Sequence, residues 1–326
     1  MTVIDHRDID RRIWEGELED YVPGRLYDMH VHMWSEAHAG DSEKSGLRRE
    51  IDYRDHLAWA EALYPGREIH FLVLATPIVG MDAHGHNEWM AAEMAADPRS
   101  GVNMMVTPAM SPEYVDAMVE RHGFVGLKPY RTFAPDPAEA PIRDFLPEPL
   151  IEVAHQRGLA VTMHLSKRAG PADFENLADL ERYTRVYPGV RWILAHCARG
   201  FNAVFLEEAI HFLKGLPGIW YDTSAVNDLY AHYLLMKHED RRRVMYGSDN
   251  VVAGCSRGKY VTYAGAWHFH GGDPALPHCD PEATWVIYEQ LRQERQVADM
   301  LGLTRSEIED HFWGNAVRFF GELGRR

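Results

Sequence analysis

Short apolar segments that end in a polar residue recur along the whole chain, and this pattern constrains the fold more than any other feature. Eight of them have the length and composition of buried β-strands, and stretches long enough for a helix separate most of them. The predicted strands cover residues 26–33, 69–76, 102–108, 124–129, 159–165, 191–197, 218–223 and 243–248. The predicted helices cover residues 52–64, 86–97, 111–122, 144–157, 173–187 and 201–214. Strand and helix alternating in this way are typical of a parallel (β/α)8 barrel, the TIM barrel, with a doubly wound open sheet as the alternative.

No linker, repeat or low-complexity stretch divides the chain, so we expect one barrel domain over residues 1–326. Residues 1–25 are predicted to form an N-terminal extension that contains a short polar helix. The segment 250–280 is rich in Gly and Pro, and we expect a long loop there, after the last strand, that is able to cover a site. Residues 281–326 are predicted to form C-terminal helices.

The charge balance limits the partners that the chain can bind. Its formal net charge of −15 argues against a surface for nucleic acid or an anionic membrane, because both need an excess of Lys and Arg. The 3 Cys are scattered, which predicts free thiols in a reducing compartment. The N-terminus has no secretory signal, and no apolar run approaches the roughly 18 residues of a membrane span. We therefore expect a cytoplasmic protein whose partner is a small molecule, and the sequence leaves a homo-oligomer open.

Five polar residues at the ends of predicted strands form the candidate functional set. His30 and His32 end the first strand and lie two residues apart, so both point to the same face. His164 ends the fifth strand, His196 the sixth and Asp249 the eighth. Because the carboxyl ends of barrel strands meet at one mouth, we expect these side chains to converge. Imidazole and carboxylate groups are the ligands that a first-row divalent metal ion takes in proteins.

The His-x-His spacing is weak on its own, because a chain with 19 His in 326 residues contains about one such pair by chance. Two further pairs, His84/His86 and His268/His270, fall in predicted loops, where we expect solvated side chains. Position at the end of a convincing strand is what separates the first pair from these two.

The five candidate residues, in this order along the chain, resemble the amidohydrolase superfamily, and most closely its amidohydrolase-related branch. That branch contains hydrolases as well as decarboxylases similar to aminocarboxymuconate semialdehyde decarboxylase. The resemblance runs from about residue 26 to the segment 313–319, Trp-Gly-Asn-Ala-Val-Arg-Phe, which is similar to the end of that branch.

The resemblance implies a TIM barrel with one divalent metal ion on residues that match His30, His32, His164 and Asp249. Zinc is the first expectation, with manganese, cobalt and iron as alternatives. The residue that matches His196 is an acid/base or substrate-polarising group in mononuclear members. A second metal ion is not expected.

Lys128 lies on the fourth predicted strand, where binuclear members of the superfamily use a carboxylated lysine to bridge two metal ions. The following Pro129 and Tyr130 and the nearby Arg131 suit equally a lysine that binds substrate or forms an internal ion pair, and we prefer that interpretation.

The candidate substrate-binding residues all follow or flank strand ends. They are Trp34, Lys128, Tyr130, Arg131, Arg168 and Arg199. Cationic groups at the mouth of an acidic protein favour a substrate that bears a carboxylate, since guanidinium binds carboxylate through two hydrogen bonds. Pairing of these arginines with acidic residues on neighbouring helices is the alternative.

One reaction is preferred, and two alternatives stay open. We expect hydrolysis of an amide or lactone bond by metal-activated water, with Asp249 as the base and His196 polarising the carbonyl. Non-oxidative decarboxylation of an unsaturated or aromatic acid is the first alternative. The second is a metal-free lactonase or a non-catalytic binding barrel. Asp28 and Asp222, which also lie on strands, are expected to be structural.

Overall fold

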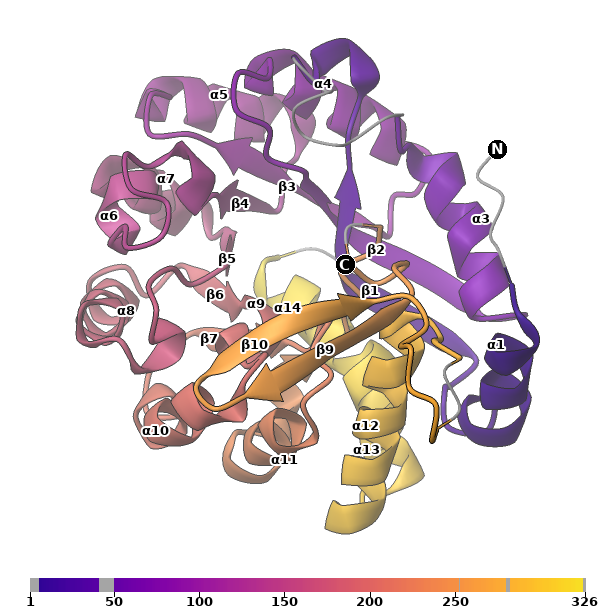
Figure 1. Ribbon diagram of the computed structural model, residues 1–326. Coiled ribbons are helices and arrows are strands. Elements are labelled where there is room, and N and C mark those ends of the chain that lie inside the picture. Colours follow the sequence, from indigo (N-terminus) through magenta and orange to yellow (C-terminus); the bar gives the residue numbers. More distant parts are fainter. Residues whose placement is uncertain (1–5, 41–49, 252, 280–281, 325–326) are drawn as a thin grey trace.

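Eight parallel strands, each paired with the next in chain order, form the centre of the protein (Figure 1). The computed structural model describes residues 6–40, 50–251, 253–279 and 282–324, so the outermost parts of the predicted terminal segments lie outside the described residues. The strands are β1 (Arg25–Met33), β2 (Glu68–Ala75), β3 (Gly101–Val106), β4 (Gly126–Pro129), β5 (Ala160–Met163), β6 (Arg191–Leu194), β7 (Ile219–Asp222) and β8 (Val244–Met245). The predicted (β/α)8 barrel is confirmed.

Backbone hydrogen bonds between the first and last strand regions bring the two edges of the sheet together. The amide of Met29 donates to the carbonyl of Tyr246 (2.9 Å), and the amide of Asp249 donates to the carbonyl of His30 (2.8 Å). These bonds place Asp249 beside β1, although the two are far apart in the sequence.

Helices surround the sheet and cover its outer face (Figure 1). The longer ones are α3 (Tyr53–Leu63), α4 (Ala83–Met94), α5 (Pro112–His122), α7 (Glu148–Arg157), α8 (Phe174–Val186), α10 (Ala203–Leu213), α11 (Leu229–His238) and α12 (Val286–Leu301). The shorter ones are α1 (Asp8–Ile13), α6 (Ile142–Phe145), α9 (Ala195–Arg199), α13 (Arg305–Glu309) and α14 (Asn315–Glu322). Short 3-10 segments span Glu36–His38, Arg131–Phe133, Gly170–Ala172 and Arg241–Arg243, and π-helical turns span Trp14–Leu18 and Asp310–Gly314. The predicted C-terminal helices are present.

Local sequence explains where these helices begin and end. In α5, Ser111 accepts a hydrogen bond from the amide of Tyr114, Pro112 occupies the first turn, and Gly123 ends the helix in the left-handed conformation. The helix α7 ends in the same way at Gly158. Among the described residues, no helix is long and apolar enough to cross a membrane.

The described hydrophobic core consists of two clusters of buried residues. Most strand residues are buried on both faces, as expected for a parallel sheet enclosed by helices. At one end, Phe319 and Phe320 of α14 pack with Trp220 of β7 and Met245 of β8. The opposite end, where the strands finish, carries the polar residues.

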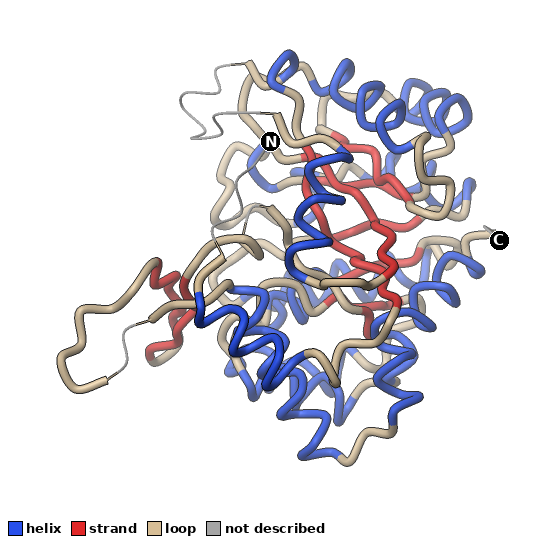
Figure 2. The backbone as a smooth tube through the Cα atoms, turned by 90° about the vertical axis from the view of Figure 1, so that its right-hand side faces the viewer, coloured by secondary structure: helices blue, strands red, loops and turns tan. Residues whose placement is uncertain are grey.

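The segment 250–280 is more ordered than the predicted loop. It contains an antiparallel hairpin of β9 (Gly258–Tyr263) and β10 (Ala266–Gly271) that lies outside the barrel and across one end of it (Figures 1 and 2). His268 and His270 therefore lie on a strand, and His84 and His86 lie on α4, so the prediction of loops for both pairs was wrong. His86 is fully buried rather than solvated.

Candidate metal centre

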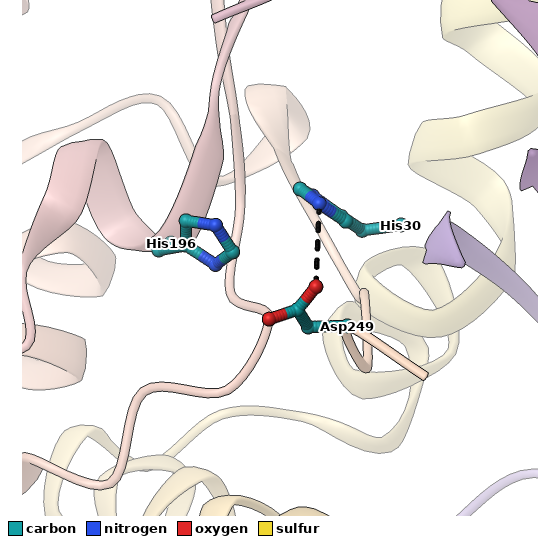
Figure 3. A group of neighbouring side chains, drawn as sticks. All are labelled: His30, His196 and Asp249. Carbon is teal, nitrogen blue, oxygen red and sulfur yellow. Dashed lines mark ion pairs between the residues drawn. The ribbon is translucent and has the colours of Figure 1, made fainter. Parts of the chain in front are cut away.

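The five candidate residues come from the carboxyl ends of four strands. His30 and His32 occupy the last part of β1, and His164 follows β5 directly. His196 lies in α9, which begins directly after β6, and Asp249 lies in the segment that follows β8. Four of the five are buried, and His164 is half-buried. The structure therefore brings His30, His32, His196 and Asp249 together, and Figure 3 shows His30, His196 and Asp249 as neighbours.

The distances between ligand atoms suit a metal ion. His32 Nε2 lies 3.0 Å from Asp249 Oδ1, His30 Nε2 lies 3.2 Å from His32 Nε2, and His30 Nε2 lies 3.6 Å from Asp249 Oδ1. Ligands of a tetrahedral zinc ion, at about 2.0 to 2.1 Å from the metal, are about 3.3 Å from one another. His30, His196 and Asp249 also offer ligand atoms within 4.8 Å of one another. His164 lies beside His196, with ring centroids 5.1 Å apart.

In all four histidines, Nδ1 lies within hydrogen-bond distance of a carbonyl or carboxylate oxygen, which only accepts. The pairs are His30 with Asp222 Oδ2 (2.9 Å), His32 with the Ala75 carbonyl (3.0 Å), His164 with the Leu165 carbonyl (3.0 Å) and His196 with the Ser224 carbonyl (2.9 Å). Nδ1 therefore carries the proton in each neutral ring, and Nε2 keeps its lone pair.

Three atoms with lone pairs face one another at the centre. They are Nε2 of His30, Nε2 of His32 and the carboxylate oxygen Oδ1 of Asp249. Such atoms repel at 3.0 to 3.6 Å unless a positive charge, a proton or a metal ion, lies between them. Burial lowers the pKa of His30 to about 4, which disfavours a proton there. The donor set therefore fits a divalent cation, and the fixed Nδ1 hydrogen bonds are those that orient metal-binding histidines.

Asp222 organises this centre, although its sequence position led us to expect a structural role. Its Oδ2 accepts from His30, and its Oδ1 accepts from the amides of His196 (3.0 Å) and Ser224 (3.1 Å). Burial alone would raise the pKa of Asp222, but the interactions of its carboxylate with His30 outweigh this effect and hold the pKa below its usual range. The carboxylate is thus ionised and orients His30 and the backbone of His196. Its place at the end of β7 was the available sequence signal.

His196 sits in a left-handed turn built from residues other than glycine. The φ values from His196 to Arg199 are 59°, 51°, 57° and 64°, although each such residue costs about 1 to 2 kcal/mol. Lys167, Ala225 and Asp249 also have positive φ (66°, 57° and 58°), so backbone strain gathers around the mouth.

Gln290 of α12 supports this strained region from outside the barrel. Its Oε1 accepts from the amide of Ala225 (2.8 Å), and its Nε2 donates to the carbonyl of Gly247 (2.8 Å). One buried side chain thereby joins the segment that holds His196 through Ser224 to the segment that carries Asp249. Nothing in the sequence marked Gln290.

Lys128, a predicted substrate-binding residue, lies near enough to the centre for the charges of Asp222 and Asp249 to act on it. It is 1% exposed, and no hydrogen bond or ion pair to its ammonium group is found among the described residues. Its Nζ lies 5.1 Å from the ring centroid of Tyr130. Burial lowers the pKa of Lys128 to about 8, against the opposing charges of Asp222 and Asp249. A buried ammonium group that forms no hydrogen bond or ion pair with a carboxylate is a candidate site for an anionic ligand.

The other predicted substrate-binding residues differ in whether their side chains are engaged within the protein or exposed to solvent. Tyr130 donates its hydroxyl hydrogen bond to the Ala75 carbonyl, and Trp34 is buried. Arg131 donates to the Pro137 carbonyl (2.6 Å), and Arg199 donates to the carbonyls of Ser166 (3.2 Å) and Lys167. Arg168 is exposed. The arginine pairing that we considered, with carboxylates of neighbouring helices, is thus not what holds Arg131 and Arg199.

A barrel with histidines and a carboxylate gathered at the mouth defines a class of enzyme scaffold, and the sequence profile agrees with it. Residues 27–321 match the family described as amidohydrolase. The chain therefore belongs to the amidohydrolase family, as the ordered residues predicted. A search of curated proteins finds no match.

Solved structures of the same fold carry different names. A Pseudomonas putida protein assigned as a 2-pyrone-4,6-dicarboxylic acid hydrolase is 17% identical, with a TM-score of 0.55 and coverage of 92% of this chain and 99% of that one. The 5-carboxyvanillate decarboxylase of Sphingomonas paucimobilis is 15% identical, with a TM-score of 0.55 and the same coverages. An amidohydrolase from Burkholderia multivorans with bound zinc is 14% identical, with a TM-score of 0.60 and coverages of 91% and 99%.

Proposed function

We propose that this protein is a metal-dependent hydrolase that cleaves an amide or lactone bond in a small substrate with a carboxylate. The observation that carries the proposal is the set of converging lone pairs on His30, His32 and Asp249, which calls for a cation. We further propose that His164 completes the ligand set and that the ion is zinc, as in the Burkholderia neighbour.

A divalent ion held by these residues would supply Lewis acidity and lower the pKa of water to about 7. Asp249 removes the proton of the attacking water and returns it to the leaving group. Its carboxylate is ionised and so able to accept a proton, because the interactions with His32 and the nearby histidines outweigh burial and lower the pKa of Asp249. His196 polarises the carbonyl in this proposal through Nε2, because the contact of its Nδ1 with the Ser224 carbonyl leaves Nε2 as the ring nitrogen that faces the substrate.

Lys128 binds the carboxylate of the substrate in this proposal. A carboxylate beside its ammonium group supplies the missing counter-ion and forms a charge-assisted hydrogen bond in a water-poor site. The exposed Arg168 is placed to attract the same charge at the mouth.

The test of the proposed reaction uses untagged protein loaded with zinc and a panel of lactones and N-acyl amino acids. We expect one zinc per chain and hydrolysis of at least one compound. Asp249→Asn should lower turnover by about 1,000-fold or more while leaving the thermal unfolding midpoint close to that of the wild type.

The exposed Asp299 provides a matched control, because Asp299→Asn makes the same chemical change far from the centre. That variant should keep full activity. Near-normal turnover in Asp249→Asn would refute the assignment of the base.

Decarboxylation is the second candidate, and the buried Lys128 together with the Sphingomonas neighbour favours it. In that case Lys128 holds a carboxylate that stays on the product, and the centre protonates the carbon that loses CO2. Release of CO2 from aromatic acids, measured beside hydrolysis, separates the two reactions. Stoichiometric zinc argues against the metal-free lactonase and the binding barrel.

A further inference from the structure

The β9–β10 hairpin forms a roof over the mouth of the barrel (Figures 1 and 2). Tyr260 of β9 pairs with Phe269 of β10, and Thr262 pairs with Trp267. Because side chains alternate along a strand, Tyr260, Trp267 and Phe269 share one face of the hairpin. The other face carries residues such as Tyr263, which is 85% exposed.

The aromatic face of the hairpin contacts the candidate centre through Phe201. The ring of Phe201 stacks on Trp267 (4.5 Å between centroids) and lies 4.9 Å from Tyr260. On its other side, Phe201 lies 5.1 Å from His196. A continuous row of rings therefore runs from the hairpin to the centre, and Tyr260 and Trp267 belong to the surroundings of the site.

Polar contacts fix the roof at its tip and its middle. The Asn202 amide donates to the carbonyls of Ala264 (2.7 Å) and Ala266 (2.9 Å) in the hairpin turn. The Oδ1 atom of Asn227 accepts from the amide of Tyr260 (2.8 Å).

The base of the hairpin is fixed as well. The guanidinium of Arg257 pairs with the buried Asp10 carboxylate (2.6 Å) and lies 4.1 Å from the ring centroid of Trp285. The hairpin is thus a fixed cover, and the side chains on its inner face have defined positions.

The hydroxyl of Tyr260 is a polar group on this inner face. No hydrogen bond to it is found among the described residues, although the side chain is half-buried. Burial and then the negative charge of Asp249 raise the pKa of Tyr260 to about 12, so the hydroxyl keeps its proton at neutral pH. Such a group is a hydrogen-bond donor for a ligand held beneath it.

We infer that Tyr260 contacts the substrate directly and donates a hydrogen bond from its hydroxyl to a carboxylate or carbonyl oxygen. The inference rests on the proposed function, because it places a carboxylate-bearing substrate between the roof and the centre. It makes the hairpin, an element outside the eight-stranded barrel, a determinant of substrate binding.

The test measures binding rather than turnover. Isothermal titration of the full-length, zinc-loaded protein uses two probes, benzoate and glutarate. Tyr260→Phe removes the hydroxyl and keeps the ring contacts, and we expect it to raise the Kd of at least one probe by about 5-fold or more. Tyr263→Phe makes the same change on the outer face of the same strand, and its Kd values should stay within about 2-fold of the wild type. Zinc content and the unfolding midpoint should be equal in all three proteins.

Three outcomes would overturn the inference. They are wild-type affinity in Tyr260→Phe, an equal loss in Tyr263→Phe, and no binding of either probe to the wild type. Failure of the proposed reaction can be distinguished from failure of the contact. If binding depends on Tyr260 but no lactone or amide is cleaved, the proposed reaction is wrong and the contact is supported. If hydrolysis is found and Tyr260→Phe binds like the wild type, the contact alone is wrong.

Discussion

At the scale of a single residue, the buried ammonium group of Lys128 lowers the stability of the fold and favours the binding of an anionic ligand. This ammonium group is buried without a direct ion pair among the described residues, which destabilises the folded state, and burial lowers its pKa to about 8 from a usual value near 10.4. A fold keeps such a group where a ligand neutralises it.

We predict that Lys128→Met stabilises the protein at pH 7 by about 1 to 3 kcal/mol, because an apolar side chain of similar length replaces an unpaired charge. The same change should weaken the binding of glutarate by about 10-fold or more. Chemical denaturation and titration calorimetry measure the two effects. The exposed Lys214→Met serves as the control and should change neither quantity. Lower stability together with unchanged glutarate binding would contradict the role given to Lys128.

At this scale, the sequence indicated residues that the structure brings together, but not the atoms that orient them. Strand ends and the two-residue spacing were enough for His30, His32, His196 and Asp249. The Nδ1 partners include backbone carbonyls, and every residue has one, so no residue type marks them. The sequence could have indicated Asp222 as well, because it ends β7 and a polar residue at a strand end was the criterion that selected His164.

At the scale of elements, the left-handed turn in α9 is the feature that the sequence did not predict. It spans four residues, none of them glycine, so nothing in its composition predicts positive φ. The hydrogen bond from the His196 amide to Asp222 and the contacts of Arg199 with the loop after β5 hold the turn in place.

We predict that Ala198→Gly leaves the free energy of unfolding within about 0.5 kcal/mol of the wild type. Relief of left-handed strain at φ 57° offsets the lost methyl group and the greater entropy of the unfolded chain. Ala209 is as buried as Ala198 but lies in the regular helix α10. The matched change Ala209→Gly should therefore destabilise the protein by about 1 to 2 kcal/mol. Thermal and chemical unfolding of both variants measure the difference. Equal losses would show that the turn stores no strain.

The hairpin shows a different reason for a missed element. Gly and Pro at either end of segment 250–280 indicated a loop, yet Lys-Tyr-Val-Thr-Tyr and Trp-His-Phe-His flank a short Ala-Gly turn. Those two runs pair in register, so the strands were detectable, whereas their placement over the mouth depends on Asn202 and Asn227 from other loops.

For the whole molecule, buried histidines set the response to acid. Burial lowers the pKa of His56 and of His86 to about 4, and neither belongs to the candidate centre. An unfolded chain has histidine pKa values near 6.5, so between pH 6.5 and 4 the unfolded state binds more protons than the folded state. Stability therefore falls as the pH falls through this window, by up to about 1.4 kcal/mol per pH unit for each such histidine.

We predict that His86→Leu reduces this slope. His86 is fully buried and neither ring nitrogen has a hydrogen-bond partner among the described residues, so a leucine loses no polar contact there. The unfolding midpoint at pH 5 should rise relative to the wild type, while the midpoint at pH 8 should change little. Calorimetric scans from pH 4.5 to 8 measure both, and the exposed His84→Leu, two residues away on α4, is the control. A parallel shift at every pH would contradict the titration of His86.

The alternation of the eight barrel strands with helices was predictable, because apolar and helical stretches that alternate in this way favour a parallel barrel without knowledge of any single contact. In the described structure, β9 and β10 pair with each other and form a sheet separate from the eight strands of the barrel. Insertions, deletions or exchanges within this hairpin would therefore leave every hydrogen bond between barrel strands in place. Ligand preference can diverge in such a segment while the chain continues to fold, and exchange of the hairpin alone is the natural starting point for redesign.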